Sequence, residues 1–354
     1  MRARNILVVI AAMVLGACAP EAVAQSDAEA TYQEALKYDP IYGPAPDALK
    51  AVALYGKACE ADHAAACKGL GLIYMRAQPG FQNAFIANAF FKKSCENGYA
   101  LGCFNLGVNF AEGKGLLAPD LLNAARLYEK ACEGDVYDGC TNLGVFYAEG
   151  RGDLIPVNIE RAKALYLRGC EHDEAYSCFN LGDMLRRGKK LARDDQKAAL
   201  FLEKACMLGM PYACSLAGYI IASDPGRNGS AEHAARLNKM GCDLGGAKSC
   251  EFLGFHYLSG PAIEENYWKS VETFGRGCDV EDPRLCFLAG SMSLNTPIDP
   301  KNPRQRLHKN LKGAITYFQK GLMLNPDDQE LAQGLRENLK AAELELRQAS
   351  TPKR

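Results

Sequence analysis

Cysteine is the residue type whose number and spacing point most directly to chemistry in this sequence. The chain has 354 residues and 15 cysteines, and fourteen of these form seven pairs with the common spacing C-x7-C. The pairs are Cys59 and Cys67, Cys95 and Cys103, Cys132 and Cys140, Cys170 and Cys178, Cys206 and Cys214, Cys242 and Cys250, and Cys278 and Cys286. Thiols at a fixed spacing can bind a metal, carry out redox exchange, or form structural disulfides.

The spacing favours structural disulfides over the other two chemistries. Structural zinc sites usually group cysteines as C-x2-4-C, catalytic thiol exchange usually uses C-x-x-C, and haem attachment uses C-x-x-C-H. None of these motifs occurs in the sequence. We therefore expect neither a metal nor a cofactor, and we interpret the fourteen cysteines as seven structural disulfides.

A disulfide within a pair requires the chain to reverse between the two cysteines. Eight residues along one helix would separate the Cα atoms by about 12 Å, whereas a disulfide needs them within about 7 Å. Segments such as "EGDVYDG" (133–139) and "MLGMPYA" (207–213) hold glycine or proline early in the span, which suits a turn. We expect each bridge to tie the end of one helix to the start of the next.

The cysteine pairs belong to a longer repeating pattern. Successive pairs begin 36 to 38 residues apart, a period typical of repeat architectures. The residue four after each second cysteine is always glycine: Gly71, Gly107, Gly144, Gly182, Gly218, Gly254 and Gly290. Because glycine inside a helix costs about 1 kcal/mol relative to alanine, we expect neighbouring elements to approach closely there, for example two backbones.

Each repeat can be interpreted as two helices that position the cysteines. The segment "CTNLGVFYAEG" (140–150) carries apolar residues at helical spacing and ends at Gly150, and "IERAKALYLRGC" (159–170) resumes an alanine-rich amphipathic pattern. A loop over 151–158 joins the two. No stretch shows sustained β-type alternation, so the sequence predicts an all-α chain.

With these residues in view, the sequence resembles the Sel1-like repeat, a relative of the tetratricopeptide repeat, and in particular its secreted, cysteine-rich bacterial branch. The resemblance rests on the cysteine spacing, the helix glycine, Gly-x-Gly loops such as Gly150-Arg151-Gly152, and an aromatic four residues before the first cysteine. These aromatics are Tyr55, Phe91, Tyr128, Tyr166 and Phe274. The resemblance implies a right-handed α-solenoid of αα-hairpins whose concave surface binds proteins or peptides.

The resemblance also sets the expected domain organisation. About seven Sel1-like units fill residues 45–297, with Ala217 and Ala289 standing where leucine is usual and the Gly-x-Gly loop lost after the fourth unit. Residues 25–44 precede the array. Residues 298–348 resemble a tetratricopeptide unit and suit a capping repeat, and residues 349–354 are predicted to be a disordered tail.

The N-terminus has the pattern of an export signal. Two arginines precede an apolar run that is too short to remain as a membrane span. Two processing sites compete within residues 1–24. The favoured one is a bacterial lipobox that ends at residue 17 and leaves Cys18 as a lipidated first residue, while ordinary cleavage after Ala24 is the alternative. Ala19 favours the outer membrane, so we expect a periplasmic, lipid-anchored protein.

Catalysis is the competing class of function. Members of the cysteine-rich branch are often described as β-lactamases or penicillin-binding proteins, whose serine chemistry uses S-x-x-K with S-D-N and K-T-G partners. The only S-x-x-K here is Ser350–Lys353 in the predicted tail, and the partner motifs are missing. The five histidines, His63, His172, His233, His256 and His308, are scattered. We expect no catalysis, with a β-lactam-binding or β-lactam-hydrolysing protein as the alternative.

Binding residues are harder to single out. Asparagine stands two residues after the second cysteine in three successive units, as Asn105, Asn142 and Asn180, and an amide offers both a donor and an acceptor to a peptide backbone. The alternative is that each asparagine bonds within its own repeats. With a net charge of -1, the chain lacks the basic excess of a nucleic-acid binder. We expect a scaffold for an envelope protein, a peptide or a cell-wall-linked partner.

Overall fold

We describe a computed structural model of the chain, which covers residues 19–76, 82–188, 191–223, 230–260, 265–296, 298–299, 302–306 and 309–350. The predicted lipidation site Cys18 and most of the predicted signal peptide lie outside these residues. The chain divides into two compact units, Met1–His172 and Asp173–Arg354.

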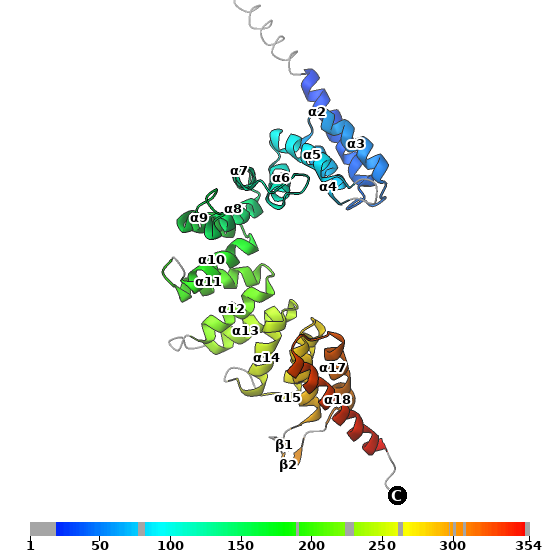
Figure 1. The fold of residues 1–354 in the computed structure, drawn as a ribbon, viewed down its shortest axis with the longest axis vertical. Helices are drawn as coiled ribbons and strands as arrows, with labels where there is room; N and C mark the ends of the chain where they lie inside the picture. The colour runs from blue at the N-terminus through cyan, green and yellow to red at the C-terminus, as the bar shows by residue number, and fades with distance from the viewer. Residues whose placement is uncertain are drawn as a thin grey trace, which may run out of the picture. The chain divides into compact units, whose positions relative to one another are not determined.

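The first unit is a succession of helices, each of which packs on the next along the chain (Figure 1). Its helices are α2 (Ala19–Tyr38), α3 (Ala48–Glu60), α4 (Ala64–Arg76), α5 (Ala84–Glu96), α6 (Ala100–Glu112), α7 (Leu121–Glu133), α8 (Tyr137–Glu149) and α9 (Ile159–Glu171). The core lies between these layers, where side chains such as Tyr55, Leu70 and Leu143 are almost fully buried.

The second unit continues the same helical pattern and ends in a cysteine-free hairpin. Its helices are α10 (Ala175–Arg187), α11 (Asp195–Met207), α12 (Pro211–Ala222), α13 (Ser230–Asp243), α14 (Ala247–Ser259), α15 (Tyr267–Asp279), α16 (Pro283–Leu294), α17 (Leu311–Met323) and α18 (Gln329–Ser350). Helix α18 includes Ala349 and Ser350, so these two residues of the predicted disordered tail are helical.

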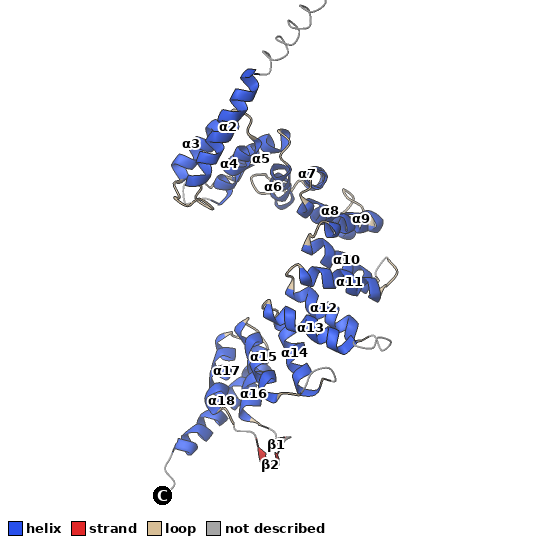
Figure 2. Cartoon of the chain, turned by 180° about the vertical axis from the view of Figure 1, so that it is seen from behind, coloured by secondary structure: helices blue, strands red, loops and turns tan. Residues whose placement is uncertain are grey.

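A short β-hairpin in the second unit departs from the all-α prediction (Figure 2). Strands β1 (Ile298–Asp299) and β2 (Asn302–Arg306) pair antiparallel between α16 and α17. Pro303 lies within β2, and the sequence also has proline at 297 and 300. Proline disfavours a helix because it removes a backbone donor and clashes with the preceding helical turn.

Six of the helices that lead to the first cysteine of a pair, and the cysteine-free helix α17, begin at side-chain caps. Each starts after an aspartate or asparagine whose side-chain oxygen accepts a hydrogen bond from the backbone N–H three residues later: Asp47, Asn83, Asp120, Asn158, Asp194, Asn266 and, for α17, Asn310. Such a cap satisfies one of the four free N–H groups at a helix start and contributes about 1 kcal/mol.

The chain reverses at a single position in every repeat, three residues after the first cysteine. The residues there have positive φ: Asp62, Gly98, Asp135, Asp173, Gly209, Gly245 and Glu281. In "EGDVYDG" the reversal is at Asp135, with φ 62°, while Gly134 has φ -90°. The expectation that early glycine or proline makes the turn is therefore wrong for this segment, because aspartate itself tolerates the left-handed conformation.

This reversal brings the paired cysteines within bonding distance. Cys132 and Cys140 form a disulfide with Cα atoms 4.7 Å apart, and the separations in the five bridges at Cys59, Cys95, Cys206, Cys242 and Cys278 are 4.6 to 4.8 Å. Cys170 and Cys178 are disulfide-bonded as well. Each bridge joins the last turn of one helix to the first turn of the next.

The recurrent helix glycine makes room for a side chain of the following helix, and the expectation of two touching backbones is not what the structure shows. A Cβ atom on Gly144 of α8 would lie 2.6 Å from the ring of Tyr166 on α9. The same arrangement places Phe91 against Gly71, and Phe274 against Gly254. Glycine and ring thus form one repeated contact in the core.

Candidate functional site

The three asparagines singled out by the sequence lie on equivalent helices. Asn105 is on α6 and Asn142 on α8 in the first unit, and Asn180 is on α10 in the second unit. All three side chains are half-buried. Their position inside the first turns of these helices follows from the cysteine register.

Two of these amides have partners within the repeats. Asn105 donates from Nδ2 to the Leu101 carbonyl oxygen, 2.8 Å away in the same helix. Asn142 hydrogen-bonds Tyr128 of the preceding helix; burial raises the pKa of Tyr128 to about 12, and this hydrogen bond opposes the rise. An amide has two donor hydrogens and two acceptor lone pairs, so these contacts leave part of its hydrogen-bonding capacity free for a ligand.

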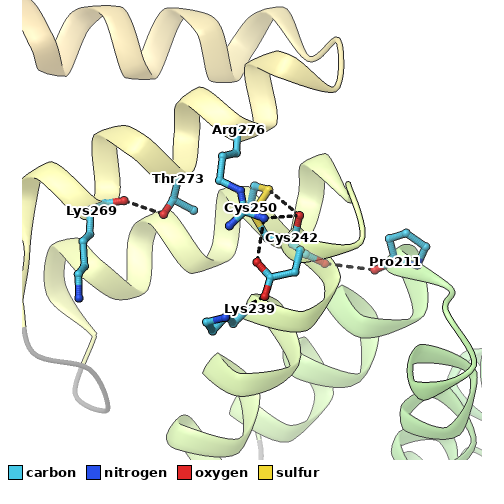
Figure 3. Close-up of a disulfide and its surroundings, with 9 residues drawn as sticks. Pro211, Lys239, Cys242, Cys250, Lys269, Thr273 and Arg276 are labelled. Atoms are coloured by element: carbon cyan, nitrogen blue, oxygen red, sulfur yellow. Dashed lines mark hydrogen bonds and ion pairs between the residues drawn. A yellow bond between two sulfur atoms is a disulfide. The ribbon is translucent and has the colours of Figure 1, made fainter.

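The junction at the sixth disulfide shows how neighbouring hairpins are held (Figure 3). Arg276 on α15 donates to the Cys242 carbonyl oxygen at 3.0 Å and to Asp243 Oδ1 at 2.8 Å. Lys239 donates to the other oxygen of Asp243, also at 2.8 Å. The hydrogen bonds from Lys239 and Arg276 hold the pKa of the Asp243 carboxyl below its usual value, although partial burial opposes them.

Ion pairs of this kind recur at other junctions. A cation on one helix reaches an aspartate at the end of the preceding cysteine helix or in the turn that follows that helix: Lys93 with Asp62 (3.0 Å), Arg168 with Asp135 (3.7 Å), Lys204 with Asp173 (2.8 Å), Arg276 with Asp243 (2.8 Å) and Lys320 with Asp279 (2.6 Å). Sequence reasoning missed this row, although Lys or Arg stands two before the first cysteine in six of the seven units. These exposed pairs are screened by solvent and contribute little to stability, but they link neighbouring hairpins.

A pocket of about 270 Å³ opens where α12, α13 and α14 meet. Tyr219, Phe252 and Phe255 form aromatic walls, and Asn238, His256 and Ser259 supply polar side chains. Asn238 is 2% exposed, its Nδ2 lies 3.4 Å from His256 Nε2, and its Oδ1 has no hydrogen-bond partner. Burial lowers the pKa of His256, which favours the neutral imidazole.

Sequence reasoning did not find this pocket. The signal was available, because Asn238 stands four residues before Cys242, where five other units have an aromatic residue. What the sequence could not supply was the contact that this aromatic makes with the glycine of the preceding helix.

The other residues that could take part in catalysis or metal binding are dispersed along the chain. Ser350 is exposed and donates to the Leu346 carbonyl oxygen within α18, and Lys353 lies outside the described residues. His63 pairs with Glu29 and His233 with Glu203, each at 2.8 Å. In the part of the chain that the structure describes, no three His, Cys, Asp or Glu side chains gather as a metal site, and no helix is long and apolar enough to span a membrane.

Comparisons with known proteins agree with this architecture. The family model described as Sel1 repeat matches residues 39–63, 64–99, 100–136, 138–174 and 175–210. No curated protein matches the sequence. The fold is similar to that of a protective antigen of uropathogenic Escherichia coli strains described as having an SLR fold. The two sequences are 16% identical, with a TM-score of 0.63 over 92% of this chain and 72% of that one.

A second solved structure is a Sel1 repeat protein from Oxalobacter formigenes. It is 24% identical, with a TM-score of 0.51 over 65% of this chain and 93% of that one. These likenesses confirm the predicted all-α solenoid, and the disulfides continue the hairpin pattern beyond residue 210. The chain therefore contains five Sel1 repeats in residues 39–210, and disulfide-bonded helical hairpins extend past them.

Proposed function

We propose that this protein is an exported, non-catalytic scaffold that is lipid-anchored through Cys18 to the bacterial outer membrane and binds a protein or peptide partner in the cell envelope. Sel1 repeat proteins generally bind protein partners. Fourteen disulfide-bonded cysteines suit an oxidising compartment outside the cytoplasm.

The observation that carries the proposal is the presence of a disulfide at successive hairpin junctions. A bridge there fixes the side chains of one hairpin relative to those of the next. Since ordering an interface costs roughly 0.5–1.5 kcal/mol for each immobilised side chain, a surface that is already ordered binds with a smaller entropic loss. Such rigidity suits recognition of an extended partner.

The spare hydrogen-bonding capacity of Asn105, Asn142 and Asn180 suits a peptide backbone. Amides at equivalent positions of successive hairpins can bond backbone N–H and C=O groups of an extended chain without selecting its side chains. Side-chain pockets elsewhere in the array would then supply specificity. Peptide crosslinks of the cell wall offer the same backbone groups.

The lipid anchor is tested with Cys18→Ser. Cells that express the wild type or the variant are fed a radiolabelled fatty acid and fractionated. We expect the wild type to carry label and to sediment with outer membranes, and the variant to lose the label and the membrane association. A wild-type protein that is unlabelled and cleaved after Ala24 would contradict the anchor.

The binding role is tested by crosslinking in cells followed by purification under denaturing conditions. The combined variant Asn105→Ala, Asn142→Ala and Asn180→Ala is compared with the wild type and with Asn338→Ala. Asn338 makes the same bond to the carbonyl four residues earlier, at 2.8 Å, but on α18. At about 0.5–1.5 kcal/mol per lost hydrogen bond, we expect the combined variant to lose tenfold or more of the crosslinked partner. Equal yields from all three proteins would exclude the asparagines from the interface.

The non-catalytic part of the proposal is tested separately with a chromogenic β-lactam. We expect the purified, oxidised protein to give no turnover above buffer, and Ser350→Ala to behave identically. Turnover that survives Ser350→Ala would contradict the scaffold proposal and favour a hydrolase.

A further inference from the structure

One of the seven helix glycines is not faced by a large apolar side chain, although all the others are. The helix glycine of each hairpin faces a residue of the following helix, and these residues are Phe91, Tyr128, Tyr166, Leu202, Phe274 and Phe318 opposite six of the seven glycines. All six are at most 3% exposed. Opposite Gly218 of α12, the corresponding residue is Asn238 of α13, whose amide atoms lie 3.1 and 3.2 Å from where a glycine Cβ would be.

The pocket described above lies beside the contact between Gly218 and Asn238. Gly218 and Asn238 both line it, together with Tyr219 and Phe255. Replacing a large core side chain by a small one leaves a cavity when the surroundings collapse only in part, so the space is that of a missing ring. Tyr219 and Phe255 are 58% and 45% exposed, and these aromatic faces are available to an incoming group.

The floor of the pocket contains a hydrogen-bond acceptor that has no partner. Asn238 is almost fully buried, and its Oδ1 has no partner, an arrangement that destabilises the empty protein. Its amide head lies between Gly218 and His256, both of which line the pocket. Because the terminal torsion of asparagine is soft, the oxygen can turn toward a donor that enters from the open side.

The pocket is also electrically neutral. No Asp, Glu, Lys or Arg lines it, and burial disfavours the charged form of His256 by lowering its pKa. A volume of about 270 Å³ falls just below the range of roughly 300–1,000 Å³ that holds drug-sized ligands. The occupant is therefore uncharged and about the size of one aromatic side chain.

We propose that this pocket binds a neutral aromatic ring that carries one hydrogen-bond donor, as a tryptophan side chain of the partner protein does. The ring takes the place of the missing repeat aromatic, between Tyr219 and Phe255, and its N–H donates to Asn238 Oδ1. This inference rests on the proposed function as a protein-binding scaffold and names the anchor residue of the partner.

The test measures binding of indole and of 1-methylindole to the full-length oxidised protein by ligand-observed NMR titration. For a ring of this size we expect indole to bind the wild type with a Kd on the order of 1 mM. 1-Methylindole keeps the ring but lacks the donor, and we expect it to bind about two- to tenfold more weakly, which is the fold-change of one net hydrogen bond.

Two variants assign the site. Asn238→Phe introduces phenylalanine, the residue that faces the helix glycine as Phe91, Phe274 and Phe318 in other repeats. We therefore expect this variant to fold, to melt at a higher temperature and to bind neither probe. Asn238→Ala keeps the cavity but removes the acceptor, so we expect it to bind both probes equally. Absence of indole binding to the wild type at about 10 mM, or binding that survives Asn238→Phe, would overturn the pocket assignment.

The crosslinking experiment separates this inference from the proposed function. If Asn238→Phe abolishes indole binding but leaves partner crosslinking at the wild-type level, the scaffold function stands and the assignment of the pocket as the partner's anchor site is wrong. If indole binds as expected but no partner crosslinks to any variant, the pocket stands and the proposed function fails. Parallel loss of both signals in Asn238→Phe supports both.

Discussion

At the residue scale, the position three after each first cysteine decides whether a bridge can form. Asp135 occupies the left-handed conformation there, and its carboxylate also accepts a hydrogen bond from the Tyr137 hydroxyl at 3.0 Å. The sequence predicted a reversal between the cysteines but favoured the early glycine, Gly134, over its neighbour Asp135. Comparing the seven units in register would have found it, since the position holds Asp, Gly or Glu throughout.

Substitution at this turn gives a direct test. We expect Asp135→Val to lower the free energy of unfolding by about 1–2 kcal/mol, because a β-branched residue is strained at positive φ. Asparagine also tolerates positive φ, so Asp135→Asn removes only the charge. We expect this variant to lower the free energy of unfolding by less than about 1 kcal/mol. Chemical denaturation of both variants checks this, and equal stability of the two would show that the left-handed position is not decisive.

The helix glycines give a second prediction with a matched control. Gly144→Ala places a methyl group against the Tyr166 ring, and we expect this overpacking to destabilise the protein by about 1–3 kcal/mol. Gly56 lies in α3 with nothing within 4 Å of the same added atom. Gly56→Ala should therefore stabilise by up to about 1 kcal/mol through helix propensity alone. Thermal melts of the same sign for both variants would contradict the contact.

At the scale of the hairpin, the disulfide holds a short loop and acts locally. Closing a loop of about nine residues contributes roughly 2–3 kcal/mol in the chain-entropy account. Since repeats interact mainly with their neighbours, we expect the double variant Cys132→Ala and Cys140→Ala to lose about that stability. Hydrogen exchange should rise in α7 and α8 and remain unchanged in α17 and α18. Uniformly faster exchange along the chain would show that the bridge acts globally.

The ion pairs between hairpins predict an acid-sensitive contribution to stability. Lys239 and Arg276 lower the pKa of Asp243 in the folded protein, so the unfolded chain binds a proton first as the pH falls. This stability is present above the ordinary aspartate pKa of about 3.9 and is lost as the pH falls through the lowered value.

Asp243→Asn should therefore lose less stability than the wild type between pH 6 and pH 2.5. The side chain is 45% exposed, and solvent screening keeps the difference below about 1 kcal/mol. Urea denaturation at the two pH values measures it. A variant as acid-sensitive as the wild type would exclude Asp243 from this effect.

At the scale of the whole molecule, the sequence predicted the fold well because its period and cysteine register were explicit. Cys132, Cys140 and Gly144 recur at fixed offsets in every unit, and only a chain reversal satisfies the bridge distance. The β-hairpin at 298–306 was missed because two short strands leave no alternating pattern. The Asn238 pocket was missed because it arises from an absent side chain, which becomes visible only when the facing glycine is known.

The central claim is that the protein is an oxidised array in which each bridge closes its own hairpin junction. Peptide mapping without reduction, on protein isolated from the cell envelope after blocking free thiols, tests it most directly. The account predicts seven bridges that join each cysteine between Cys59 and Cys286 to its partner eight residues away, and no blocked thiol among the fourteen. Bridges between different pairs, or fourteen free thiols, would contradict it.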